Sequence, residues 1–236
     1  MITDLGKVLI GKGVTLPDRL LQKYLQWRYI RKTLEYLKIN CVLDVGANKG
    51  QFATSLRKVG YSGRIISFEP IRKDFETLSQ TLAADQNWQG FNLALGNENG
   101  PKTFNISTKE TQLSSFLNLK AEGWGIESHT VEMQQLDRLF PELIAKIPNP
   151  RVFLKMDTQG YDMEVVKGAQ DSISQVLGLI SELAVRPAYD NMPSYLESLR
   201  CYEELGFRLV DLGVAARDGK TSEMVEYDCI MVRAGA

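Results

Sequence analysis

The stretch Leu43-Asp44-Val45-Gly46-Ala47-Asn48-Lys49-Gly50-Gln51-Phe52 is the most informative part of this 236-residue sequence. It joins a short apolar run, residues 41–45, to a helix-forming segment through two glycines. The pattern predicts a buried parallel strand that turns sharply into a helix. At the carboxyl end of a parallel sheet such a turn borders a ligand crevice beside a helix N-terminus. Gly46 and Gly50 allow positive φ and a close approach of a ligand to the backbone.

The glycine pattern differs from those of two common nucleotide sites. It lacks the G-x-G-x-x-G spacing of a dinucleotide site, and no Gly-Lys-Ser/Thr follows as in a P-loop. A second signal is Glu69, which ends the next predicted strand, residues 64–68, and precedes Pro70. A carboxylate at this place can accept two charge-assisted hydrogen bonds from the cis-diol of a ribose. The turn and the acid together predict a nucleoside site.

Strands and helices alternate outward from this turn. Such alternation predicts an open, mostly parallel sheet with helices on both faces. The two last strands are joined by a short connection, which favours an antiparallel hairpin. The predicted strands are residues 41–45, 64–68, 91–95, 152–156, 176–181, 207–212 and 227–232, with helices at 51–59, 72–84, 162–169 and 195–205. The middle of the chain, 96–149, is less regular, with short strands predicted at 102–107 and 130–133 and partial helix at 136–147.

The N-terminal segment contains a predicted helix from about Pro17 to Leu37, with apolar side chains at helical spacing. Two interpretations are open. The helix packs on the core, or it forms a lid whose aromatic face lines the ligand cleft. We divide the chain into a helical lid segment, residues 1–39, and one α/β domain, residues 40–236.

Composition excludes several classes of protein. The chain has 28 Lys and Arg against 29 Asp and Glu, a balance that argues against a dedicated nucleic-acid binder. One histidine and three cysteines argue against a zinc site and against a disulfide framework, so no metal is expected. No stretch approaches a membrane span, and the N-terminus lacks a continuous apolar signal region. We therefore expect a cytoplasmic protein without a membrane span.

The sequence resembles the FkbM-type family of class I S-adenosylmethionine-dependent methyltransferases. The resemblance covers about residues 40–233 and implies a Rossmann-like fold with a mostly parallel seven-stranded sheet, helices on both faces and an antiparallel C-terminal hairpin. It also implies S-adenosylmethionine as the cofactor. The matching segments are 44–50, 68–70, 94–96 with Gly100, 114–115, 136–137, 155–161, 167–169, Glu182 and 227–230. Many family members carry Asp-x-Glu-Gly where this chain has Asp157-Thr158-Gln159-Gly160, and Gln159 cannot accept a proton at neutral pH.

The resemblance also implies where the cofactor lies. Asp44 and the turn from Gly46 to Gly50 would hold the methionine moiety, and Glu69 would bind the ribose hydroxyls. The cationic sulfonium and ammonium groups favour nearby carboxylates such as Asp44 and Asp157. The predicted cofactor-binding residues are Asp44, Gly46, Ala47, Asn48, Gly50, Phe52, Glu69, Pro70, Ala94, Leu95 and Asp157. Of these, Ala94 and Leu95 belong to residues 92–95, which would border the adenine.

Methyl transfer to a hydroxyl is helped by a general base. The candidates are Asp157, which follows the fourth strand, then Glu182, which follows the fifth, and then His129 with its near-neutral intrinsic pKa. Asp157 is equally suited to cap the helix that follows it, and His129 is better suited to a surface position on an edge strand. Arg186 and Tyr189 are candidates for hydrogen bonds to a polyhydroxylated acceptor.

The resemblance implies a methyltransferase that O-methylates a sugar, glycolipid or polyketide-like small molecule. Its partner would be a small-molecule or glycan acceptor, not a nucleic acid. The alternative is a non-catalytic module that retains the fold and binds the cofactor or a partner.

Overall fold

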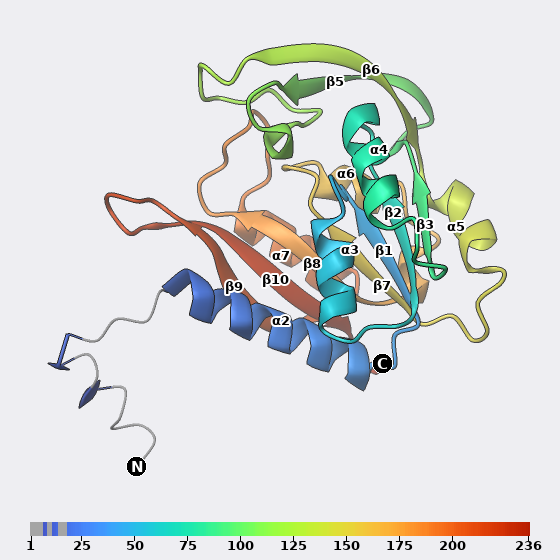
Figure 1. The fold of residues 1–236 in the computed structure, drawn as a ribbon, viewed down its shortest axis with the longest axis horizontal. Coiled ribbons are helices and arrows are strands. Elements are labelled where there is room, and N and C mark those ends of the chain that lie inside the picture. Colours follow the sequence, from blue (N-terminus) through green and yellow to red (C-terminus); the bar gives the residue numbers. More distant parts are fainter. Residues whose placement is uncertain (1–6, 9–10, 14–17) are drawn as a thin grey trace.

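The computed structural model describes residues 7–8, 11–13 and 18–236. Its main sheet has seven strands in the spatial order β3 (Trp88–Phe91), β2 (Arg64–Phe68), β1 (Cys41–Val45), β7 (Val152–Met156), β8 (Val176–Ala184), β10 (Met224–Arg233) and β9 (Phe207–Arg217), as Figure 1 shows. All neighbours are parallel except the two pairs that β10 makes with β8 and β9. The chain winds outward in one direction from β1 to β3 and in the other from β7 onward. The boundary between β1 and β7 is therefore a topological switch point, where ligands bind in open α/β sheets.

The central strands β1 and β7 are buried at every residue. Their apolar runs suit a parallel sheet that is covered on both faces, and both strands have the predicted bounds. The antiparallel C-terminal hairpin is confirmed, although β9 and β10 are longer than predicted.

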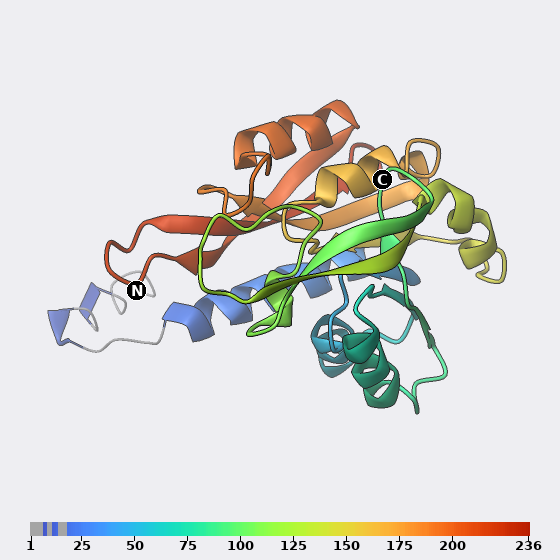
Figure 2. The same ribbon diagram turned by 90° about the horizontal axis from the view of Figure 1, so that it is seen from above.

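Helices cover both faces of the main sheet, as predicted (Figure 2). One core cluster joins α2 (Asp18–Tyr36), α3 (Gln51–Lys58) and α4 (Arg72–Thr81) to the sheet through Leu34, Leu56 and Leu78. A second cluster joins α5 (Leu136–Ile144), α6 (Asp162–Lys167) and α7 (Tyr195–Glu204) to the opposite face. No helix among the described residues is long and apolar enough to cross a bilayer.

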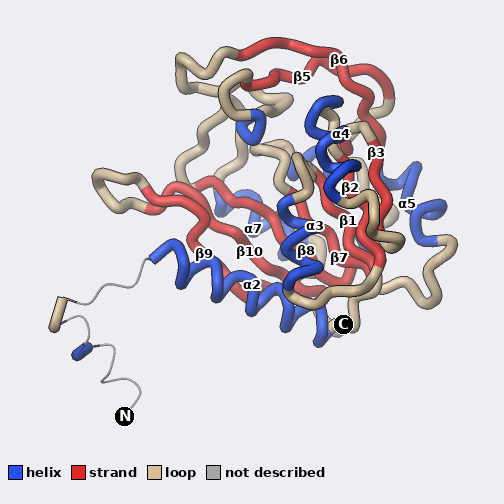
Figure 3. The backbone as a smooth tube through the Cα atoms, in the orientation of Figure 1, coloured by secondary structure: helices blue, strands red, loops and turns tan. Residues whose placement is uncertain are grey.

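A small second sheet lies beyond the carboxyl ends of the parallel strands (Figure 3). Its strands are β4 (Ala94–Leu95), β6 (Ile126–Gln134) and β5 (Gly100–Ser107), with β6 between the other two. The predicted strand at 91–95 is therefore wrong: β3 ends at Phe91, and residues 94–95 pair with β6 instead. The break falls where Asn92 donates side-chain hydrogen bonds to the carbonyls of Glu69 and Pro70. A continuous apolar pattern does not reveal such a change of sheet.

The helix α2 packs on the sheet and also reaches the ligand side of the molecule. Ile30 and Leu34 are buried in the core cluster. Trp27 contacts Phe52 of α3, with ring centroids 5.4 Å apart. The predicted start at Pro17 lies outside the described residues, and the end at Tyr36 is one residue earlier than predicted.

Two of the matching sequence segments, 94–96 and 167–169, meet behind the second sheet. A Cβ atom on Gly168 would lie 1.8 Å from the carbonyl oxygen of Gly96. Asp137 completes the junction, because its backbone N–H donates to the Gly168 carbonyl and its side chain accepts from the backbone N–H of Ser172 at 2.8 Å. These residues join the end of β4 in the second sheet to the end of α6, which packs on the main sheet.

Replacing Gly168 by Ala tests this junction. Since the added Cβ atom would meet a backbone carbonyl oxygen, the variant must shift the end of α6 against the segment that follows β4, and we expect the free energy of unfolding in urea to fall by about 2–3 kcal/mol. The control is Gly219→Ala, where a Cβ atom meets nothing within 4 Å. The control should change stability by less than about 1 kcal/mol. Equal stability of the two variants would contradict the tight junction.

Candidate functional site

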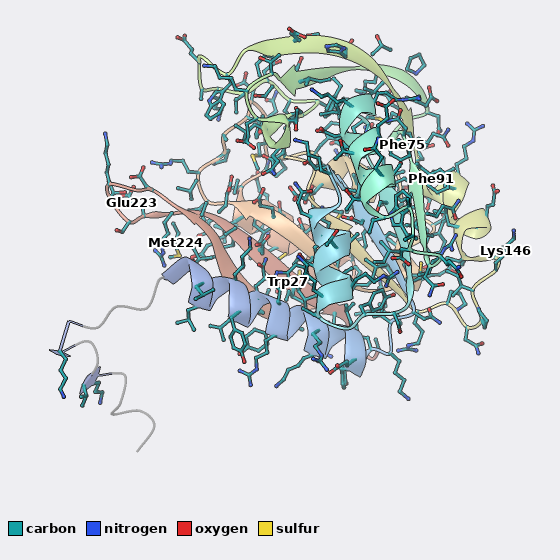
Figure 4. All side chains as sticks on the ribbon, in the orientation of Figure 1. Trp27, Phe75, Phe91, Lys146, Glu223 and Met224 are labelled. Carbon is teal, nitrogen blue, oxygen red and sulfur yellow. The ribbon has the colours of Figure 1, made fainter. Side chains whose placement is uncertain are left out.

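A cavity of about 500 Å³ lies at the carboxyl ends of β1, β2, β7 and β8. The turn after β1, the residues that follow β2 and β7, and Ile180 and Glu182 of β8 form its floor. Phe104 of β5 lines another side, with Ser114 and Phe116 from the segment between β5 and β6. On the remaining side α2 contributes Trp27, which points toward α3 in Figure 4. The cavity is thus at the switch point of the sheet, enclosed by elements from distant parts of the chain.

The turn after β1 has left-handed backbone at Gly46 (φ 70°), Asn48 (φ 47°) and Gly50 (φ 89°). The predicted positive φ of both glycines is confirmed. A Cβ atom on Gly46 would lie 2.0 Å from the Asp157 carbonyl oxygen, and one on Gly50 would lie 2.9 Å from Leu78. The Cβ side of each glycine therefore faces protein. On that side the absence of a side chain lets the chain pack closely on itself. It does not make room for a ligand there.

Glu69 lies at the cavity, 4% exposed. The backbone N–H of Asn48 donates to its Oε2 at 2.7 Å, and the backbone N–H of Ile71 donates to its Oε1 at 2.8 Å. Burial nevertheless raises the pKa of this carboxyl to about 7. Each carboxylate oxygen can accept a further hydrogen bond, so hydroxyl donors from a ligand would stabilise the ionised form.

Asp44 is fully buried beneath the turn and does not line the cavity. Its Oδ1 lies 3.0 Å from Lys155 Nζ, and Asp44 and Lys155 are register partners on β1 and β7. Burial lowers the pKa of Lys155, but Asp44 and Asp157 outweigh it and raise the pKa above its ordinary value. The Lys155 ammonium also donates to the Gly46 carbonyl at 2.9 Å. Asp44 therefore acts on the turn through Lys155.

Asp157 and Glu182 meet at the cavity through the side-chain amide of Gln159. Its Nε2 donates to Asp157 Oδ1 and to Glu182 Oε2, both at 3.0 Å. The Tyr189 hydroxyl lies 3.1 Å from Gln159 Oε1 and 3.0 Å from the Leu113 carbonyl oxygen. The predicted base candidates Asp157 and Glu182 are thus brought together, and Tyr189 is a buried partner of Gln159.

The loop that carries Asp157 is anchored by Asp162. Its Oδ1 accepts from the Thr158 backbone N–H at 3.0 Å, and its Oδ2 accepts from the Ser181 hydroxyl at 2.6 Å. Asp157 contacts Gln159 and lies 3.6 Å from Lys155, and α6 has no side-chain cap. The alternative that Asp157 caps this helix is therefore wrong, because Asp162 makes the contacts that hold the loop.

Further acids gather near Glu182, and sequence reasoning gave them no role. Asp228 on β10 lies directly opposite Glu182 on β8 and accepts a hydrogen bond from Gln26 of α2 at 2.5 Å. Burial and the nearby Asp157 carboxylate raise the pKa of Asp228 to about 7 and that of Glu182 well above its ordinary value. Asp228 belongs to a matching segment, 227–230, but only the strand register shows that it faces the site. No group of three or more His, Cys, Asp or Glu side chains in the described residues is arranged to hold a metal ion.

The remaining predicted residues divide between the cavity and other places. His129 lies on β6 with its side chain 52% exposed, 3.4 Å from Glu127, and is not among the residues that line the cavity. Arg186 pairs with Asp218 at 2.9 Å. Gly50 begins α3 and does not line the cavity either. The predicted cofactor-binding residues that line the cavity are Gly46, Ala47, Asn48, Phe52, Glu69, Pro70, Ala94, Leu95 and Asp157.

Comparison with known proteins identifies the family. A family model described as the methyltransferase FkbM domain matches residues 44–209. The chain belongs to the FkbM methyltransferase family. Membership confirms the predicted Rossmann-like fold and S-adenosylmethionine as the cofactor of this FkbM protein. Comparison with curated proteins gave no significant match.

Several solved methyltransferase structures are similar to this FkbM protein. Magnesium protoporphyrin IX methyltransferase from Synechocystis PCC 6803 with bound SAH is 12% identical, with 91% of this chain and 84% of that chain covered and a TM-score of 0.49. The methyltransferase domain of bacterial CtHen1-C is 8% identical, with 90% and 99% covered and a TM-score of 0.48. Likeness at this level says nothing about the acceptor of this chain.

The residues at the cavity fit the cofactor. A volume of about 500 Å³ is within the usual range for a small-molecule site. Two backbone N–H groups hold Glu69 at the cavity. Further hydrogen-bond donors, such as the hydroxyls of a ribose, would stabilise its ionised carboxylate. The carboxylates at the other end of the cavity suit a cationic sulfonium.

Replacing Lys155 by Met tests the ion pair beneath the turn. The variant leaves the Asp44 carboxylate buried without its cation, and we expect a loss of about 3–5 kcal/mol in urea unfolding. In the double variant Asp44→Asn with Lys155→Met no charge remains unpaired, so it should be more stable than Lys155→Met alone. A double variant that loses the sum of the two single effects would contradict the pairing.

Proposed function

We propose that this FkbM protein is an S-adenosylmethionine-dependent O-methyltransferase whose acceptor is a hydroxyl group of a sugar, glycolipid or polyketide-like small molecule. One observation carries the proposal: a single cavity has Glu69 after β2 and, joined by hydrogen bonds, Asp157 and Gln159 after β7 and Glu182 near the end of β8. From β2 to β8 is three strand spacings, about 14 Å. That span leaves room for a nucleoside at one end and an acceptor at the other.

The cofactor-binding residues are assigned on their positions around the cavity. Glu69 would accept hydrogen bonds from the ribose hydroxyls, and the backbone from Gly46 to Asn48 would border the methionine moiety. Ala94 and Leu95 of β4 would border the adenine. Asp44 would act indirectly, because it holds Lys155 and Lys155 holds the carbonyl of Gly46.

When bound, S-adenosylmethionine supplies a methyl group activated by its sulfonium, which bonds to the acceptor oxygen as the carbon–sulfur bond breaks toward sulfur. The task left to the protein is to orient the acceptor and to take the proton of its hydroxyl. Asp157 and Glu182 are the carboxylates placed for this task. His129 has no contact with the cavity, and we give it no role.

The walls of the cavity favour a neutral, hydroxyl-rich acceptor. Glu182, Asp228 and the Gln26 amide of α2 supply hydrogen-bonding groups, while Trp27 and Phe116 supply flat apolar surfaces. Asp157 at this end, together with Glu182 and Asp228 whenever they are ionised, would repel the phosphates of a nucleic acid. The near balance of charge in the whole chain supports the same conclusion. In this proposal α2 is the lid segment, and the protein acts in the cytoplasm.

Replacing Glu69 by Ala should weaken cofactor binding by about 1.5–3 kcal/mol, because a charge-assisted contact with the ribose is lost. Titration calorimetry with S-adenosylmethionine and S-adenosylhomocysteine measures the loss, and Glu76→Ala on the exposed face of α4 is the matched control. Because the pKa of Glu69 is about 7, the pH dependence of cofactor binding gives a second test. Below that pH the carboxyl is protonated, so wild-type affinity should fall as the pH drops from 8 to 6, and the fall should be smaller in the variant. An unchanged dissociation constant would refute the ribose role.

Methyl transfer itself is tested by incubating the protein with isotope-labelled cofactor and cell extract. We expect mass spectrometry to find S-adenosylhomocysteine and a product that carries the label on a hydroxyl oxygen. The alternative is a non-catalytic cofactor-binding module. Retention of intact cofactor without turnover, across a broad panel of hydroxylated acceptors, would favour that alternative.

A further inference from the structure

We propose that Gln159 is the positioning residue of the acceptor site: its amide fixes Asp157 and Glu182 and leaves one oxygen of Glu182 free to take the acceptor's proton. The inference rests on the proposed function, which left the base open between these two carboxylates. It assigns Glu182 as the base that takes the acceptor's proton. It also gives Gln159 the task of donating hydrogen bonds to both acids, which an ionised carboxylate in its place could not do.

The orientation of the Gln159 amide follows from its neighbours. A carboxylate is only an acceptor, so Asp157 Oδ1 and Glu182 Oε2 require a donor between them, and both lie 3.0 Å from Nε2. The flipped amide would place Oε1 against two carboxylates and would be repelled. In the observed orientation Oε1 faces the Tyr189 hydroxyl, whose single proton can be donated to Oε1 or to the Leu113 carbonyl oxygen. The two N–H groups of Nε2 thus serve one carboxylate each.

The backbone that carries this amide is held on every side. Gln159 has left-handed backbone, with φ 53°, and its carbonyl oxygen accepts from the Ser115 hydroxyl at 2.8 Å. The preceding residue, Thr158, is held by Asp162. The following residue, Gly160, is also left-handed, and a Cβ atom there would lie 2.8 Å from Met192. Because its backbone and its amide are both held, Gln159 can position the two carboxylates to which it donates.

The second oxygen of each carboxylate has different surroundings, and this separates the two. Asp157 uses Oδ1 for Gln159, and its Oδ2 lies 3.6 Å from the Lys155 ammonium. Glu182 uses Oε2 for Gln159, and its Oε1 accepts no hydrogen bond from any described residue. Since Glu182 lines the cavity, its Oε1 is the acceptor that a hydroxyl can reach. The acceptor's O–H bond breaks, its proton goes to Oε1, and its electron pair stays on the oxygen that bonds the methyl carbon.

The charges around Glu182 make it a suitable base. Its pKa is raised well above the ordinary value by burial, next by Asp157 and then by the acids on neighbouring elements. The titratable groups that act on it are Asp157 after β7, Glu226 and Asp228 on β10, and Asp162 on α6. Burial and the charge of Glu182 in turn raise the pKa of Tyr189. An N–H donated by Gln159 favours the ionised carboxylate and opposes these effects.

The test is a 13C NMR titration of the Glu182 side-chain carboxyl, assigned by its loss in Glu182→Gln. Gln159→Leu removes the donor and should move the titration to higher pH, by about one unit. Asp157→Asn removes a like charge and should move it to lower pH. Gln112→Leu is the control, because Gln112 lines the same cavity but makes no hydrogen bond within the described residues. It should leave the titration unchanged. Neither cofactor nor acceptor is needed for these measurements.

If Gln159→Leu does not fold, Gln159→Glu replaces it, because this nearly isosteric change also removes the donor and adds a like charge. Unchanged titration of Glu182 in the folded variant would overturn the positioning role. With an acceptor in hand, Gln159→Leu should lower kcat and shift the acid limb of the pH–rate profile by the same amount, with the dissociation constant of the cofactor unchanged. Shifted titrations together with absent turnover would contradict the proposed function and leave the positioning role intact.

Discussion

A buried ion pair between two neighbouring strands, Asp44 on β1 and Lys155 on β7, holds the centre of this FkbM protein. The two residues are register partners at the point where the sheet reverses its winding. The Lys155 ammonium also holds the carbonyl of Gly46, and Gly46 packs directly on the Asp157 carbonyl. The turn after β1 and the loop after β7 are therefore fixed against each other. The proposed cofactor site depends on that alignment, because the turn and the loop both line the cavity.

The fold was largely predictable because its central strands carry an unambiguous pattern. Parallel strands covered on both faces are continuous apolar runs, and β1 and β7 were predicted to the residue. The predicted strand at residues 91–95 was wrong for a physical reason. Apolar residues indicate that a segment is buried, but they do not indicate which sheet it pairs with. The first part of β6 was missed for a related reason. Residues 126–130 are exposed, so they carry no alternation that a strand would show.

The site was predictable where function and strand ends coincide. Glu69 and Asp157 follow parallel strands and Glu182 lies near the end of another, and the carboxyl ends of such strands meet at one edge of the sheet. Contacts between distant segments were not predictable. Gln26 and Asp228 are 202 residues apart in sequence, and Tyr189 reaches Gln159 from a loop without regular structure. Asp44 shows the opposite problem: its place in the matching segment is clear from the sequence, but its burial under the turn is not.

The helix α2 has a consequence for how such a protein can change. It supplies Gln26 and Trp27 to the cavity, yet it lies wholly before residues 44–209, the part that matches the family. The wall that carries Gln26 and Trp27 is thus formed by a segment outside the family match, whereas Glu69 and the floor lie within it. Because Ile30 and Leu34 of the same helix are buried in the core, substitutions on α2 can reshape this wall only where they leave those core contacts intact.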